Sequence, residues 1–136
     1  MIYIGIDPGT NTGFAKSFDG VLHEVKTYSI VQALEAVAHT AKWAKSQDQQ
    51  LVVYIEDARL RKWVTGGREK LQGVGSVKRD CGIWEEFCVH HDIKFELVAP
   101  KNNKTKLDAE AFKRLTGWTH RTSEHARDAA MLIWGR

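Results

Sequence analysis

Four side chains suited to binding a divalent metal ion stand beside predicted strands and on a predicted helix. Asp7 follows the apolar stretch "IYIGI" and precedes a Pro-Gly turn, and Glu56 ends the β-branched run "LVVYIE". His125 and Asp128 lie three residues apart in "TSEHARDAAML", a spacing that puts both on one face of a helix. If the two strands are parallel neighbours, their carboxylates emerge at the same end of the sheet, where α/β proteins build their sites.

This set of side chains predicts a particular kind of chemistry. Carboxylate oxygens with one imidazole suit Mg²⁺, with Mn²⁺ as a substitute. Two such ions about 3.5–4 Å apart, sharing Asp7, would activate a water and stabilise the leaving oxygen of a phosphodiester. Glu124 lies about one position round the helix from His125 and is a candidate additional ligand.

Each carboxylate also has a structural interpretation, which the residues alone leave open. Asp-Pro-Gly is a common turn, in which Asp7 would accept a local hydrogen bond. Glu56 would simply end a strand, and Asp128 would pair with Arg127 or Arg59. The placement of all three at related positions favours the metal site over three separate structural roles.

The predicted secondary structure would hold these residues together. Ser29 can cap a helix, and "DG" at 19–20 predicts a hairpin turn. A last helix begins after Thr122 or Ser123 and runs through Trp134. The predicted strands are 2–7, 13–18, 21–28, 51–56 and 93–99, and the other helices begin at residue 30, span 68–91 and span 107–115. This order predicts an α/β fold of three layers, with helices packed on a five-stranded mixed sheet.

Composition places limits on the class of protein. The chain has 136 residues, of which 43% are hydrophobic and 27% charged, so we expect one globular domain over 1–136. No run approaches the ~18 apolar residues of a membrane span, and "MIYIGIDPG" lacks the pattern of a signal peptide. Cys81 and Cys88 form neither a CxxC motif nor a disulfide framework, which favours a reducing cytoplasm.

Positive charge is concentrated in the second part of the sequence. Residues 1–57 hold 4 Lys and Arg against 7 Asp and Glu, whereas residues 58–136 hold 16 against 10. Such asymmetry favours a polyanionic partner, although a solvated surface has the same composition. Trp63, inside a basic stretch, would either stack on an unpaired base or fold back on the core. The candidate DNA-contacting residues are Arg59, Arg61, Lys62, Trp63, Arg68, Lys70, Lys78, Arg79 and Lys101.

The ordered motifs resemble those of the RuvC-type Holliday junction resolvases, within the RNase H-like superfamily, and especially their compact phage versions. The matching stretches are "GIDPGTNTGFA", "VVYIED" and "HARDAAML", and "GVGSVKRDCGIWEEF" and "TKLDAEAFKRLTGW" further suggest the phage type. The first motif also resembles the phosphate-binding turn of actin-like kinases, but those have two lobes and a much longer chain. We therefore expect no nucleotide cofactor.

The resemblance implies a metal-dependent endonuclease that resolves four-way DNA junctions by paired symmetric nicks, in the cytoplasm of a bacterium or a phage-infected host. It implies that Asp7 is shared by two Mg²⁺ ions and that Glu56 and Asp128 complete the carboxylates. His125 occupies a position that is acidic in some relatives, which leaves open whether it binds metal or transfers a proton.

The resemblance also implies a homodimer with the helix at 68–91 in its interface. One side of that helix, formed by Val77, Cys81, Trp84 and Cys88, fits either that interface or the core. A lysine is expected near the scissile phosphate, and the candidates are Lys101, Lys104 and Lys106. Two other functions stay open: a related nuclease acting on other branched DNA or flaps, and a non-catalytic protein that binds junctions.

Overall fold

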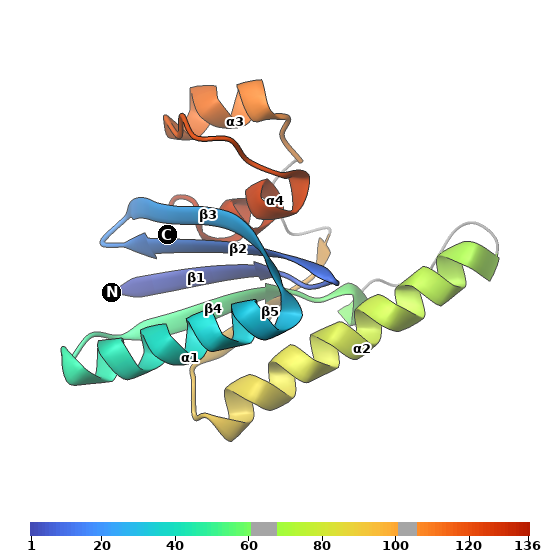
Figure 1. Ribbon diagram of the computed structural model, residues 1–136, viewed down its shortest axis with the longest axis horizontal. Coiled ribbons are helices and arrows are strands. Elements are labelled where there is room, and N and C mark those ends of the chain that lie inside the picture. The colour runs from blue at the N-terminus through green and yellow to red at the C-terminus, as the bar shows by residue number, and fades with distance from the viewer. Residues whose placement is uncertain (61–67, 101–105) are drawn as a thin grey trace.

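The computed structural model describes residues 1–60, 68–100 and 106–136, with only the backbone described for residues 68–74 and 77. Its strands are β1 (Ile2–Asp7), β2 (Asn11–Phe18), β3 (Val21–Ser29), β4 (Leu51–Glu56) and β5 (Phe95–Val98). Its α-helices are α1 (Ile30–Ser46), α2 (Arg68–His90), α3 (Ala109–Thr116) and α4 (Glu124–Ile133), and a 3₁₀ turn, η1, spans Ala58–Leu60. The strands form one mixed sheet in the order β3-β2-β1-β4-β5 (Figure 1). The predicted five-stranded α/β fold is therefore confirmed.

The pairing of β1 is the part of the topology on which the candidate site depends. β1 is antiparallel to β2 and parallel to β4. The parallel pair needs a crossover, which β2, β3 and α1 together provide. β2 and β3 form a hairpin at Asp19-Gly20, where both residues have positive φ, the geometry that matches strand twist in a two-residue turn.

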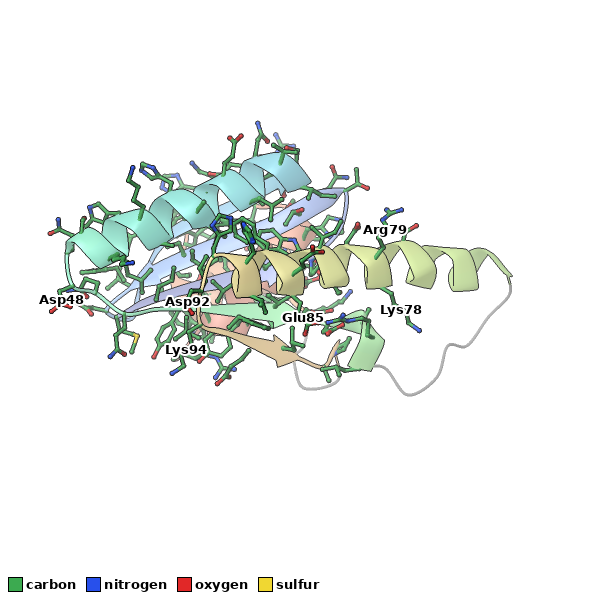
Figure 2. The ribbon with its side chains drawn as sticks, turned by 90° about the horizontal axis from the view of Figure 1, so that it is seen from below. Asp48, Lys78, Arg79, Glu85, Asp92 and Lys94 are labelled. Carbon is green, nitrogen blue, oxygen red and sulfur yellow. The ribbon has the colours of Figure 1, made fainter. Side chains whose placement is uncertain are left out.

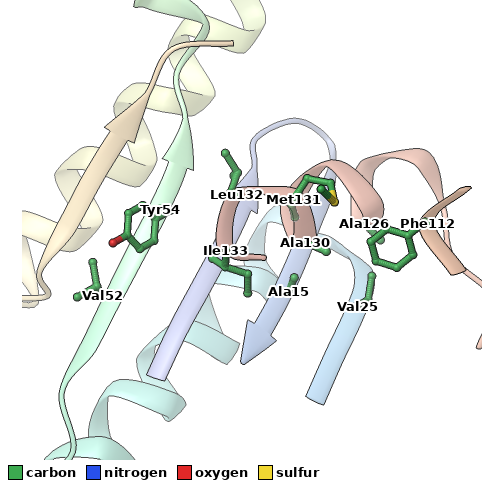
Figure 3. Close-up of a cluster of buried hydrophobic side chains, with 11 residues drawn as sticks. Ala15, Val25, Val52, Tyr54, Phe112, Ala126, Ala130, Met131, Leu132 and Ile133 are labelled. Carbon is green, nitrogen blue, oxygen red and sulfur yellow. The ribbon is translucent and has the colours of Figure 1, made fainter. Parts of the chain in front are cut away.

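Helices cover both faces of the sheet (Figure 1). On one face α1 and α2 pack over a cluster that includes Ile4, Phe14, Val37 and Trp84. On the other face α4 packs directly on the sheet, and α3 joins the same cluster through Phe112 (Figure 3). The two clusters make the three layers that the order of elements predicts.

Three of the four α2 residues that fit either the core or a dimer interface belong to the core. Cys81, Trp84 and Cys88 are 0%, 1% and 0% exposed within the single chain. Val77 lies outside the described side chains. The N-terminal part of α2 extends past the end of the sheet, beyond the layer that α1 covers (Figure 2). Among the described residues, no helix combines the length and apolar character needed to cross a membrane.

Helix caps fall close to their predicted places. Ser29 caps α1 through a reciprocal capping box with Gln32. Ser123, and not Thr122, caps α4 by accepting a hydrogen bond from the backbone N–H of Ala126. β2 begins two residues earlier than predicted, and β5 covers only the centre of its predicted range.

Candidate active site

The two strand carboxylates lie at the same edge and on the same face of the sheet. Ile6 of β1 is paired with Ile55 of β4, so the next residue of each strand is a carboxylate. Side chains alternate between faces along a strand, and Ile6 and Ile55 belong to the cluster under α1. Asp7 and Glu56 therefore face α4, and the predicted convergence of these strand ends is confirmed.

α4 brings the other two candidates to this edge. The Nδ1 atom of His125 lies 3.2 Å from Oδ2 of Asp7. The helix approaches the sheet closely because Gly5 and Gly13 lie beneath it. A Cβ at Gly13 would clash with the carbonyl oxygen of His125, and one at Gly5 would clash with that of Ala129.

The carboxylates interact electrostatically across the site. The pKa of Asp7 is raised to about 7, first by burial, then by repulsion from Glu56, and further by repulsion from Asp128. The hydrogen bond and the positive charge offered by His125 act in the opposite direction. Three acidic groups are thus near enough for their charges to oppose one another, which is the usual electrostatic state of a site that takes up cations.

Asp128 has a cationic neighbour of its own. It is 5% exposed, and burial is the first cause that raises its pKa, whereas Lys106 lowers that pKa. The Nζ atom of Lys106 lies 3.7 Å from Oδ2 of Asp128 and 3.8 Å from Oε1 of Glu124. Of the three candidate lysines, Lys106 therefore reaches the site, while Lys101 and Lys104 fall outside the described residues.

The donor chemistry fits Mg²⁺ or Mn²⁺, because carboxylate oxygens are the ligands these ions prefer and the charges of Glu56 and Asp128 both act on Asp7. In the part of the chain that the structure describes, no three His, Cys, Asp or Glu side chains are close enough to hold an ion together. Each of two carboxylates has a basic side chain beside it: His125 beside Asp7, and Lys106 beside Asp128. The side chains of His125 and Lys106 are 50% and 70% exposed, so either can adopt another rotamer when an ion binds the carboxylates.

The remaining candidate DNA contacts divide into three groups. Arg59 is bound within the protein: its guanidinium contacts both oxygens of Asp57 and lies 3.3 Å from Oε1 of Glu85. Lys78 and Arg79 are exposed on α2 (Figure 2). Arg61, Lys62 and Trp63 lie outside the described residues, as do the side chains of Arg68 and Lys70.

Asp57 is a site-adjacent residue whose role the sequence did not reveal. It directly follows Glu56 and is 1% exposed. Burial is the largest influence on its pKa and would raise it. The hydrogen bonds from Arg59 outweigh burial and hold the pKa of Asp57 below its usual range. The only signal was an acid two residues before an arginine, which is too common to be noticed without the fold.

The five-stranded mixed sheet and its helices form a RuvC-like fold, of the RNase H-like type. One solved structure with this fold is RuvC from T. thermophilus in complex with Holliday junction substrate, with a TM-score of 0.60 and 15% sequence identity. The match covers 98% of this chain and 90% of that chain. No family model matches the sequence, and no curated protein matches it. At this identity the likeness establishes the fold.

Proposed function

We propose that this chain is a metal-dependent endonuclease that cuts branched DNA, with four-way junctions as its principal substrate. The convergence of Asp7, Glu56 and Asp128 at one sheet edge supports this function most directly. Clustered acids repel phosphate, so their presence in a nucleic-acid protein makes sense when cations neutralise them. The fold shared with a RuvC bound to a Holliday junction supports the choice of substrate.

Each residue at the edge has a role in this proposal. Asp7, Glu56 and Asp128 would hold two divalent ions, with Asp7 shared between them. When bound, Mg²⁺ or Mn²⁺ supplies an activated water and charge stabilisation for the leaving oxygen. His125 is placed to accept or donate a proton at Nδ1, the atom that lies 3.2 Å from Asp7. Lys106, largely exposed beside Asp128, offers a positive charge to the scissile phosphate.

The substrate would extend beyond this edge. Lys78 and Arg79 on the projecting part of α2, together with the basic residues between 61 and 70, would neutralise backbone phosphates. A homodimer would present two such sites to the two symmetric strands of a junction and give paired nicks. A nuclease for flaps or other branches, and a non-catalytic junction binder, are the competing functions.

The deciding experiment is cleavage of a labelled synthetic four-way junction by the wild type and by Asp7→Asn, in Mg²⁺, in Mn²⁺ and in EDTA. We expect paired symmetric nicks that require both a divalent ion and Asp7. Asp48→Asn is the matched control, because Asp48 is exposed, lies far from the edge and has a positive φ that asparagine also adopts (Figure 2).

Other outcomes would select a different function. Metal-dependent cleavage of flaps or linear duplex in preference to the junction would contradict the substrate and keep the site. Tight junction binding with no cleavage in either metal would favour the non-catalytic binder, and Asp7 would then be a turn residue. Equal cleavage by Asp7→Asn and the wild type would reject the proposed site altogether.

A further inference from the structure

One residue from each of three neighbouring strands forms a row beneath the first turn of α4. Asp7 of β1 is paired with Gly13 of β2, and Gly13 is paired with Thr27 of β3. Residues directly opposite one another in antiparallel strands point to the same face. Ala15 and Val25, two residues along from Gly13 and Thr27, lie in the cluster under α4, so this row also faces α4.

Each member of the row meets a different part of the first turn of α4. Asp7 meets the imidazole of His125 at its Nδ1 atom. Gly13 lies against the backbone carbonyl of His125, where no larger residue fits. Thr27 meets the cap of the helix, because its Oγ1 atom shares a hydrogen bond with Oγ of Ser123. The first turn of α4 is thus held at three points across three strands.

Ser123 connects this contact to the site. Its Oγ accepts a hydrogen bond from the backbone N–H of Ala126. The hydroxyl that contacts Thr27 is therefore the one that caps the helix. A shift of Ser123 moves the start of α4, and His125 is only two residues further along. The contact of Thr27 with Ser123 therefore lies outside the carboxylate cluster but acts on the helix turn that carries the imidazole.

We propose that Thr27 is a positioning residue, which fixes the imidazole of His125 against Asp7 by holding the N-cap of α4 to β3. The expected effect of Thr27 on cleavage rests on the proposed function, whereas its effect on the position of His125 does not. Thr27 and Ser123 are both exposed, so their hydrogen bond adds little to global stability and its value lies in placement. β3, an edge strand that carries none of the candidate ligands, thereby takes part in the site.

The test compares Thr27→Val, which keeps the shape of the side chain and removes the hydroxyl, with Thr27→Ser, which keeps the hydroxyl. Two quantities are measured on the full-length protein: the proton NMR resonance of the His125 imidazole, assigned by its loss in His125→Gln, and the rate of junction cleavage at saturating protein. We expect Thr27→Val to move the resonance and slow cleavage about ten-fold, with junction affinity unchanged. Thr27→Ser should restore both.

An unmoved His125 resonance in folded Thr27→Val would overturn the proposal, and so would an equal displacement in Thr27→Ser. Should Thr27→Val not fold, Ser123→Gly removes the same hydrogen bond from the other side, and glycine is well tolerated at an N-cap. If the wild type cuts no branched DNA, the proposed function fails, and the resonance comparison alone still decides the role of Thr27.

Discussion

At Asp7, the charge that the proposed cation binding requires is the charge that folding disfavours. The pKa of Asp7 is raised to about 7 in the folded chain, against 3.8 for an ordinary aspartate. Burial is the largest cause, and repulsion from Glu56 and then from Asp128 adds to it. Folding therefore favours the protonated carboxyl. The stability that this group contributes is complete below about pH 4 and is lost as the pH rises through about 7.

We expect Asp7→Asn to be more stable than the wild type at pH 8 in EDTA, by about 2–4 kcal/mol, because the amide removes the repelled charge. At pH 4 the two proteins should unfold at nearly the same temperature. Thermal unfolding across this pH range measures the difference, with Asp48→Asn as the exposed control. A wild type that is the more stable of the two at pH 8 would contradict the electrostatic description of the site.

Burial is the main influence on the pKa of both thiols. Burial raises the pKa of Cys81 to about 11 and that of Cys88 to about 12, and both side chains are fully buried. Because the thiolate is the reactive form, we expect neither cysteine to react with a disulfide reagent such as DTNB at pH 8 until the protein unfolds. Release of two thiols in denaturant and none in buffer is the expected result. Fast reaction of the native protein would show that the α2 side of the core is open.

At the scale of elements, the distance between α4 and the sheet determines whether the site assembles. Gly5 and Gly13 allow the helix backbone to lie directly on β1 and β2. The same approach brings His125 within hydrogen-bond distance of Asp7 and turns Asp128 into a buried position. The geometry of the candidate site therefore depends on two residues that have no side chain at all.

Gly13→Ala should destabilise the protein by about 3 kcal/mol, because the added methyl meets backbone that has no room to move. Gly75→Ala is the matched control: an added Cβ there meets open space within α2, and alanine favours the helix by up to about 1 kcal/mol. Urea unfolding of both variants measures the contrast. If Gly13→Ala is tolerated as well as Gly75→Ala, α4 does not need its close approach.

Local sequence patterns predicted the helices and strands well. The features that the sequence did not predict are contacts between residues far apart in the chain. The Asp19-Gly20 turn, the Ser29 cap and the strand ending at Asp7 each have a cause within a few residues, so the sequence indicated them. Gly13 contacts His125, more than a hundred residues away in the sequence, and no local pattern predicts this contact. The single face shared by Asp7 and Glu56 follows only once the register of β1 with β4 is known.

At the scale of the whole molecule, exposed positive charge and the candidate site are on different elements. The acids belong to β1, β4 and α4, whereas Lys78 and Arg79 lie on the part of α2 that extends past the sheet (Figure 2). A substrate that contacts both must be long enough to leave the carboxylate edge and run along α2. Double-stranded arms of a branched DNA have that extent.

We expect the double variant Lys78→Gln and Arg79→Gln to weaken junction binding and to lower the slope of log affinity against log salt by about 1–2. The control is Lys42→Gln with Lys45→Gln, which removes the same charge from the exposed side of α1. Binding titrations at several salt concentrations measure the slope. A drop of equal size in the control would mean that net charge alone, and not the position of α2, governs affinity.

The alternation of side chains along β1 and β4 also limits how the gene for this protein can change. Deleting or inserting one codon within either strand would carry its terminal carboxylate to the opposite face of the sheet, under α1 and away from α4. Extra codons at the Asp19-Gly20 turn would leave the register of β1 with β4 intact. Descendants of this sequence should therefore vary in the length of their loops and in the identity of most residues. The number of residues in β1 and in β4 should stay the same.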